Sequence, residues 1–124
     1  MKAVLSGSET ELGSRTFNAR KYSQYSDEEL LLRYRAAGER ELFEELVRRY
    51  ERELYNYLRR YLGDAELAED VFQATFLQMH LKREHFEEGR KVRPWLYTIA
   101  TNQAIDAQRR NRRHRMTEME CSSR

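Results

Sequence analysis

The stretch "RPWLYTIATNQAIDAQRRNRR", residues 93–113, combines an aromatic ring, amides and a dense block of arginines. Read as a helix, it has one stripe of mixed polar chemistry, made of Trp95, Thr98, Asn102 and Arg109. A second, more apolar stripe consists of Leu96, Ile99, Ala100, Gln103 and Ala107. An aromatic ring stacks on an unstacked base, an amide reads a base edge, and cations hold the backbone. We therefore expect the helix to pack with its apolar stripe and to present the mixed stripe to a nucleic acid.

The arginine block ends this helix. Its members lie within residues 109–115 and are Arg109, Arg110, Arg112, Arg113 and Arg115. A solvated helix end would need only one or two cations to complement the helix dipole. Five cations at this density repel one another, and such density is usual where phosphates compensate the charge. The block therefore favours contact with a nucleic acid, with a merely solvated helix end as the alternative.

Every formal charge within residues 64–79 is acidic, which suggests a second partner of a different kind. Asp64 and Glu66 suit the positive end of a helix dipole, but Asp70 lies too far into the helix for that role. Asp70, Gln73 and Leu77 follow one another at three- and four-residue spacing. This spacing predicts a face on which another protein docks.

Metal and catalytic sites receive little support from the sequence. The histidines and the cysteine, His80, His85, His114 and Cys121, lack the spacing of a recognised metal site. No nucleophile with a base and an orienting group is suggested, and no Glu-x-x-His pairs occur on the expected helices. We expect no metal, no cofactor and no enzymatic activity, with an enzyme that holds a metal in its core as an alternative.

Composition places the chain among single soluble domains. Its 124 residues suffice for one modest core, and 23 Lys and Arg against 21 Asp and Glu leave a net charge of +2. The single cysteine excludes an intramolecular disulfide, which fits a reducing compartment. No apolar run approaches the length of a membrane span, and no signal-peptide core follows Lys2. We expect a cytoplasmic protein without membrane contact.

The elements that position these residues are expected to be helices, because no segment alternates with period two. Residues 1–25 are expected to form a flexible tail. Ser26 and Glu29 form a capping box for a helix over residues 27–37, which ends at Gly38. A second helix runs within residues 39–62 to Gly63, and Asp64 caps a third over residues 65–82. After a loop at residues 83–93, a fourth helix has Pro94 in its first turn and reaches about residue 113. The expected fold is an all-α compact bundle of about four helices.

Three motifs in this order resemble region 2 of the sigma-70 family: "ELFEELVRRY" at residues 41–50, "AEDVFQATFL" at residues 68–77, and "RPWLYTIATNQAID" at residues 93–106. The closest likeness is to the extracytoplasmic-function (ECF) group of bacterial sigma factors. The resemblance covers residues 27–115, and it implies a region 2 helical domain at residues 26–115. Residues 116–124 then begin a linker to a region 4 that is absent, and we expect an excised domain or a truncated product.

The resemblance implies a transcription initiation factor with two partners. Asp70 and Gln73, with Leu77, would dock on the β′ clamp helices of core RNA polymerase. Trp95, Thr98 and Asn102 would hold non-template bases of the promoter −10 element out of the duplex. The loop before the helix would contribute Arg90, Lys91 and Arg93 to this surface. The phosphates would be held by Arg109, Arg110, Arg112 and Arg113.

Some positions depart from the pattern of the family. Ala74 stands where many members have glutamate, Thr98 where many have a basic residue, and Val92 where many have an aromatic one. An anti-sigma factor is left open as a further partner. The alternatives to the sigma interpretation are a helical protein-interaction domain without DNA-melting activity and a repressor that binds double-stranded DNA. The repressor would need a short helix-turn-helix, which the long helices disfavour.

Overall fold

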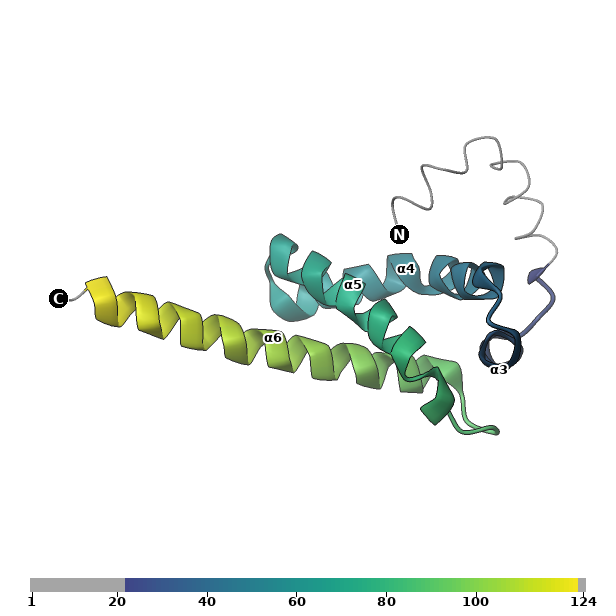
Figure 1. Ribbon diagram of the computed structural model, residues 1–124. Coiled ribbons are helices and arrows are strands. Elements are labelled where there is room, and N and C mark those ends of the chain that lie inside the picture. The colour runs from purple at the N-terminus through teal and green to yellow at the C-terminus, as the bar shows by residue number, and fades with distance from the viewer. Residues whose placement is uncertain (1–21, 123–124) are drawn as a thin grey trace. The chain divides into compact units, whose positions relative to one another are not determined.

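The computed structural model describes residues 22–122 and consists of helices joined by short connections (Figure 1). The elements are α3 (Asp27–Ala37), α4 (Arg40–Leu62), α5 (Ala65–Leu81), the 3-10 helix η2 (Arg83–His85) and α6 (Val92–Ser122). No β-strand occurs between residues 22 and 122. The predicted all-α fold of about four helices is therefore confirmed. The chain divides into two units, one up to Leu46 and one from Val47 onward.

In the first unit, the bounds of α3 follow from local capping. The Oγ of Ser26 accepts the backbone N–H of Glu29 at 3.1 Å, and the carboxylate of Glu29 accepts the N–H of Ser26 at 2.8 Å. The helix ends at Gly38, whose φ of 71° is left-handed and favours glycine. The N–H of Gly38 donates to the carbonyl of Tyr34 at 2.7 Å. The predicted helix over residues 27–37 and its capping box are confirmed.

The predicted N-terminal tail reached too far into the chain. Most of residues 1–25 lie outside the described residues, but the rings of Tyr22 and Tyr25 are packed. Tyr22 is buried, and its hydroxyl donates to the carboxylate of Glu41 at 3.2 Å. The guanidinium carbon of Arg33 lies 4.5 Å from the ring centroid of Tyr25. The polar composition of this segment gave no indication that the two rings are packed, because their partners lie on α3 and α4.

In the second unit, the core is formed by the inner faces of α4, α5 and α6. The buried side chains are Val47, Tyr50, Leu54, Leu58, Ala68, Val71, Thr75, Phe76, Met79, Phe86, Val92, Leu96, Ile99, Ala100, Ala104 and Ala107. The hydroxyl of Thr75 donates to the carbonyl of Val71 at 2.7 Å, so this polar group is satisfied inside the core. Three of the buried residues on α6 are alanines at three- and four-residue spacing, which allows a close approach to α5.

The connections determine the directions of α5 and α6. Asp64 caps α5, because its carboxylate accepts the N–H of Leu67 at 3.1 Å. The chain then turns back through η2 and the following loop, so α5 and α6 run in opposite directions (Figure 1). Pro94 lies in the first turn of α6, as predicted.

Helix α6 is longer than predicted. We expected an end at about residue 113, and a linker from residue 116, but α6 continues to Ser122. The physical reason is that no glycine or proline follows Pro94 in the sequence, while Arg, Met, Glu and Gln favour helices. In Figure 1 this part of α6 extends beyond the N-terminal end of α5.

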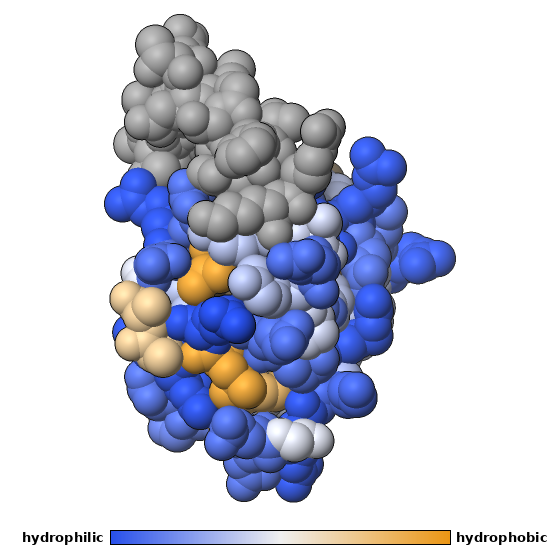
Figure 2. Space-filling view, turned by 90° about the vertical axis from the view of Figure 1, so that its right-hand side faces the viewer, coloured by the Kyte–Doolittle hydropathy of each residue, from blue (hydrophilic) through white to orange (hydrophobic). Residues whose placement is uncertain are grey.

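The surface agrees with a sequence in which 35% of residues are charged. On the face shown in Figure 2, hydrophilic side chains cover most of the area, and apolar ones gather only in small patches. Binding surfaces are therefore better sought as local combinations of side chains than as one large apolar face.

Candidate functional site

Helix α6 presents the mixed stripe that the sequence predicted. Thr98, Asn102 and Arg109 are exposed, and Trp95 is half-buried. The apolar stripe faces inward, with Leu96, Ile99, Ala100 and Ala107 buried and Gln103 half-buried. The division of α6 into an inner and an outer face is therefore confirmed.

Trp95 is held by a residue that sequence reasoning missed. The ring of Phe86 packs edge-on against Trp95, with 5.1 Å between ring centroids and an interplanar angle of 66°. Phe86 is only 2% exposed although it lies in a segment predicted to be a loop. The available signal was that Phe86 is the only aromatic residue among the charges of residues 82–91. Part of the Trp95 ring is thus committed to the core, and part remains available at the surface.

The loop before α6 is more structured than predicted. The guanidinium of Arg83 donates to the carbonyl of His80 at 2.7 Å, which satisfies an acceptor at the end of α5. Gly89 has a φ of 91°, a left-handed conformation that favours glycine in this turn. Val92 is fully buried as the first residue of α6, so it cannot contact a base from the surface.

The basic residues of this loop differ in their surroundings. Arg90 and Lys91 are exposed, and Arg90 pairs with Glu87 at 3.0 Å. Arg93, predicted to contact DNA with them, forms an ion pair with Glu53 of α4. Its guanidinium carbon also lies 5.0 Å from the ring centroid of Tyr50. Arg93 is therefore engaged with α4, whereas Lys91 has the more open position.

Glu53 joins α4 to the first turns of α6. The same carboxylate oxygen that accepts from Arg93 accepts the hydroxyl of Tyr97 at 2.9 Å. Burial and this hydrogen bond raise the pKa of Tyr97 to about 12. Glu53 was not predicted, because a glutamate among the many charges of α4 reads as a solvated side chain. The pair of contacts fixes the end of α6 that presents Trp95 and Thr98.

The raised pKa of Tyr97 predicts a loss of stability in alkali. An unfolded tyrosine ionises near pH 10, whereas Tyr97 in the folded chain keeps its proton to about pH 12. Between these values the folded state binds more protons than the unfolded state, so the free energy of unfolding falls as pH rises. Below pH 10 both states are protonated and this contribution is constant.

We expect the stability difference between the unaltered chain and Tyr97→Phe to be constant up to about pH 9. It should then shrink as the pH rises through the window set by the two pKa values. Urea denaturation at a series of pH values measures it. A difference that does not change in alkali would contradict the assignment of the hydrogen bond to Glu53.

The predicted docking face on α5 is exposed. Asp70, Gln73 and Leu77 all lie at the surface, and Leu77 is 56% exposed. The side-chain amide of Gln73 donates to the carboxylate of Glu69 at 3.0 Å. Leu81, one turn beyond Leu77, is equally exposed and was not predicted. The face is thus polar toward the start of α5 and apolar toward its end.

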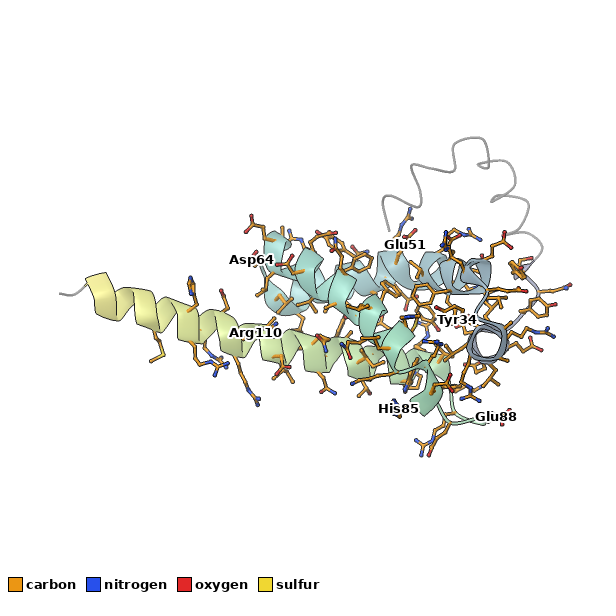
Figure 3. The ribbon with its side chains drawn as sticks, in the orientation of Figure 1. Tyr34, Glu51, Asp64, His85, Glu88 and Arg110 are labelled. Atoms are coloured by element: carbon orange, nitrogen blue, oxygen red, sulfur yellow. The ribbon has the colours of Figure 1, made fainter. Side chains whose placement is uncertain are left out.

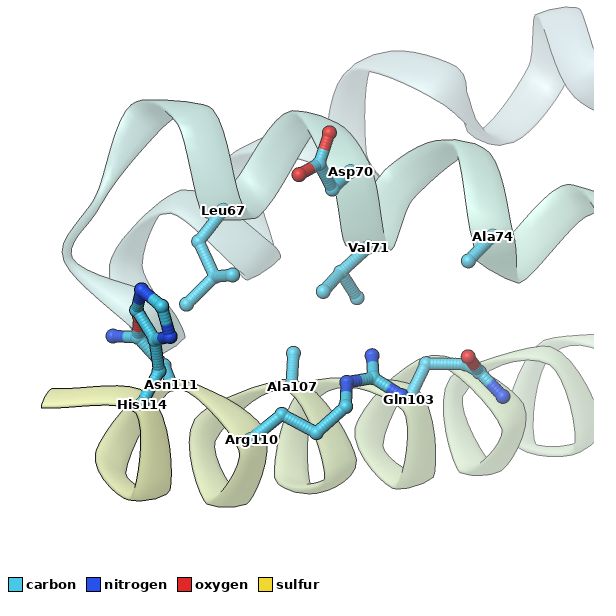
Figure 4. Close-up of a pocket in the computed structure, with 9 residues that line it drawn as sticks. All are labelled: Leu67, Asp70, Val71, Ala74, Gln103, Ala107, Arg110, Asn111 and His114. Carbon is cyan, nitrogen blue, oxygen red and sulfur yellow. The ribbon is translucent and has the colours of Figure 1, made fainter. Parts of the chain in front are cut away.

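A groove lies between α5 and α6 and is lined by one member of the arginine block, Arg110 (Figure 4). It has a volume of about 290 Å³, and its floor includes Val71, Ala74 and Ala107. Arg110 lines it from α6 and Asp70 from α5. Figure 3 also shows Arg110 near the N-terminal end of α5, which Asp64 marks. His85 and Glu88 lie near the N-terminal end of α6.

The other basic side chains of the block lie elsewhere. Arg109 and Arg113 follow Asn102 by seven and eleven residues, which is the spacing of one helix face. Arg109, Arg112 and Arg113 are exposed, as is Arg110. The helical period therefore places Arg109 and Arg113 on the stripe of Asn102, whereas Arg110 and Arg112 lie about 80° to either side of it, Arg110 toward the groove. The side chain of Arg115 lies outside the described part of the chain.

Two further findings concern the described residues alone. Among the side chains that the structure describes, no three of the types His, Cys, Asp or Glu gather closely enough to hold a metal ion. None of the helices in that range combines the length and the apolar character needed to cross a membrane.

The family description "Sigma-70 region 2" matches residues 46–114, which is more than half of the chain and includes both exposed surfaces. The chain belongs to the sigma-70 family. Its curated relatives place it in the ECF group. The match begins within α4 and ends at His114, inside the arginine-rich part of α6.

Several curated sigma factors are similar over this region. The RNA polymerase sigma factor CarQ of Myxococcus xanthus is 41% identical over 75 residues, which is 60% of this chain and 43% of CarQ. The ECF sigma factor SigW of Bacillus subtilis is 35% identical over 60% of this chain and 40% of SigW. SigM of Mycobacterium tuberculosis is 35% identical over 72% of this chain and 45% of SigM. The chain therefore spans less than half the length of these relatives. No solved structure matches it significantly.

Proposed function

We propose that this region 2 chain acts in transcription initiation by docking on core RNA polymerase and by recognising and melting the promoter −10 element. The observation that carries the proposal is the pair of exposed surfaces inside the matched residues 46–114. One is the α5 face of Asp70, Gln73 and Leu77, and the other is the α6 stripe that includes Trp95 and Asn102. Their different chemistry fits a protein partner and a nucleic-acid partner. The chain has no catalytic step of its own in this proposal.

DNA melting requires that unpaired DNA binds better than the duplex. Unstacking a base costs a few kcal/mol, and the protein must return that free energy on the open strand. Trp95 supplies a half-exposed aromatic ring for stacking, and Asn102 supplies an amide for a base edge. Phe86 and Glu53 support this part of α6 from the inside. A binding surface that is fixed before DNA arrives loses less entropy on binding.

The α5 face suits a helical partner with basic side chains. Asp70 offers a carboxylate, Gln73 an amide, and Leu77 and Leu81 offer apolar surface along the same helix. This is the arrangement of a helix-on-helix contact with an apolar part and a charged part. We propose that the β′ clamp helices occupy it. Because Ala74 lines the adjacent groove, it adds packing there instead of the carboxylate found in many relatives.

Binding to core RNA polymerase tests the docking face. We expect Asp70→Ala combined with Gln73→Ala to weaken binding at least tenfold, which is about 1.4 kcal/mol. The reason is that two polar side chains of the contact are removed without change to the core. Glu51→Ala, which removes an exposed carboxylate from α4, is the matched control and should bind normally. Fluorescence anisotropy with labelled chain measures both.

Two results would count against the docking proposal. If the unaltered chain does not bind core polymerase, recruitment is not a property of this chain. If the double variant binds as tightly as the unaltered chain, the contact lies on another face. The absence of salt-dependent binding to single-stranded −10-type DNA would favour the alternative of a protein-interaction domain without DNA-melting activity.

Asn102 is expected to contribute more to the preference for one DNA sequence over another than to the overall affinity for DNA. We expect Asn102→Ala to reduce the preference for single-stranded −10-type DNA over a scrambled sequence by about tenfold, because an amide hydrogen bond to a base edge is lost. Binding to the scrambled strand should change little. Gln108→Ala, an amide outside the stripe, is the control. An equal loss of affinity on both sequences would remove Asn102 from base recognition.

A further inference from the structure

A row of tyrosines follows the line where α4 meets α6. We call this line the α4–α6 seam, formed by Glu53, Tyr57 and Tyr61 of α4 with Arg93, Tyr97 and Thr101 of α6. The rings of Tyr57 and Tyr97 meet edge-on at a centroid distance of 5.0 Å, and the rings of Tyr57 and Tyr61 lie 5.8 Å apart. Contacts from α4 to α6 advance together along both helices, so the two helices run in parallel here.

The first two tyrosines of the seam are fixed by the protein. The hydroxyls of Tyr57 and Thr101 share a hydrogen bond of 2.8 Å, and the hydroxyl of Tyr97 is held by Glu53. Both rings are half-buried. Tyr61 ends the row and is 39% exposed, although a tyrosine at this position of the helix repeat would be expected to face the core. The row therefore supports one aromatic ring whose outer part meets solvent.

The two residues directly before Tyr61 are basic. Arg59 and Arg60 precede it on the last turn of α4 and are both exposed. Neither forms an ion pair with another side chain that the structure describes. The carboxylate of Glu53, at the other end of the seam, is neutralised by Arg93. Within α4, Arg60 lies about 100° around the helix axis from Tyr61, whereas Arg59 lies on nearly the opposite side. An exposed ring with a guanidinium group beside it matches the stacking platforms that bind single-stranded nucleic acid.

The seam is also continuous with the proposed DNA surface on α6. Tyr57 lies level with Thr101, so Tyr61, one helical turn later, lies level with about residue 105 of α6. That position is about 15 Å along α6 from Trp95 at a rise of 1.5 Å per residue. Roughly four nucleotides of a stacked strand cover this distance.

We infer that Tyr61 and Arg60 form a second contact site for single-stranded DNA, separate from the stripe of Trp95 and Asn102. Tyr61 stacks on a base about four nucleotides from the one at Trp95, and Arg60 holds an adjoining phosphate. This inference rests on the proposed function and deepens it, because it gives α4 a part in holding the open strand. The two sites together would make the bound strand longer than α6 alone can hold.

The test compares short and extended single-stranded oligonucleotides on the full chain. The short one carries a −10-type sequence, and the others add about five thymidines to its 5′ or 3′ end, which exceeds the four-nucleotide separation. We expect one of the two extensions to strengthen binding about tenfold. Tyr61→Ala should lose this gain but bind the short oligonucleotide normally, which also shows that the variant is folded.

Further variants distinguish the contribution of the aromatic ring to binding from the contribution of the positive charge. Tyr61→Phe keeps the ring and should keep the gain. Arg60→Gln should lower the salt slope for the extended oligonucleotide by about 0.7, the contribution of one phosphate contact on a single strand, whereas Arg59→Gln should lower it less. The inference is overturned if neither extension strengthens binding, or if Tyr61→Ala weakens short and extended strands equally. If the unaltered chain does not bind the short strand either, the proposed function fails and this inference falls with it.

Discussion

Replacing Phe86 with alanine is expected to lower the free energy of unfolding by about 3–5 kcal/mol. The Phe86 side chain is 2% exposed and packs edge-on against Trp95, so its removal leaves a cavity beside the start of α6. The total stability of a domain is about 5–15 kcal/mol, so this single change would remove a large part of it. Urea denaturation followed by circular dichroism measures the loss.

Fluorescence gives a second measurement of the same contact, because Trp95 is the only tryptophan of the chain. We expect the Phe86→Ala variant to change the emission of Trp95 even before unfolding. Leu77→Ala is the control, since an exposed leucine contributes within about 0.5 kcal/mol. A typical substitution lowers the free energy of unfolding by about 1 kcal/mol. If Phe86→Ala lowers it by less than about 1 kcal/mol and leaves the emission of Trp95 unchanged, Phe86 does not support Trp95 in solution.

Replacing Arg109, Arg112 and Arg113 together with glutamine is expected to lower the salt slope of single-strand binding by about 2. Each phosphate contact on a single strand contributes about 0.7 to the slope of log affinity against log salt. The three side chains are exposed on α6, beyond Asn102 toward the C-terminus. Titrations at several salt concentrations measure the slope, and affinity at low salt should fall most.

Arg110→Gln is the matched control for this triple variant. Arg110 belongs to the same block in sequence but lines the groove between α5 and α6. We expect it to change the slope by less than the 0.7 of one phosphate contact. If Arg110→Gln has the same effect as each of the other arginines, the groove does not separate it from DNA. An unchanged slope in the triple variant would remove the block from the DNA interface.

The secondary structure was largely predictable because its signals are local. Ser26 and Glu29 cap α3 within four residues of sequence, and Asp64 caps α5 in the same way. The end of α6 is the exception. The change from apolar residues to arginines was interpreted as a boundary, but a change in charge does not end a helix when no glycine, proline or cap is present.

The exposed surfaces were also predictable in outline. The helical period alone separates Asn102 and Arg109 from Leu96 and Ala100, because the two sets lie on opposite sides of one helix. The same reasoning placed Asp70 and Leu77 on the surface of α5. These statements require only that each helix forms and that its apolar side is buried.

The partners of the functional side chains depended on the tertiary structure. Arg93 and Glu53 are 40 residues apart, and Tyr57 and Thr101 are 44 residues apart. Nothing in the sequence around Glu53 distinguishes it from other glutamates of α4, so only the packing of α4 on α6 shows which carboxylate receives Arg93 and Tyr97.

The sequence by itself therefore determined the helices, their buried sides and the types of residue at the two surfaces, since these follow from contacts within about one helical turn. Only the tertiary structure decided that Phe86 supports Trp95, that Arg93 is engaged by α4, and that Arg110 faces a groove. The physical reason is that such contacts join helices distant in sequence, and their geometry exists only once the helices have packed.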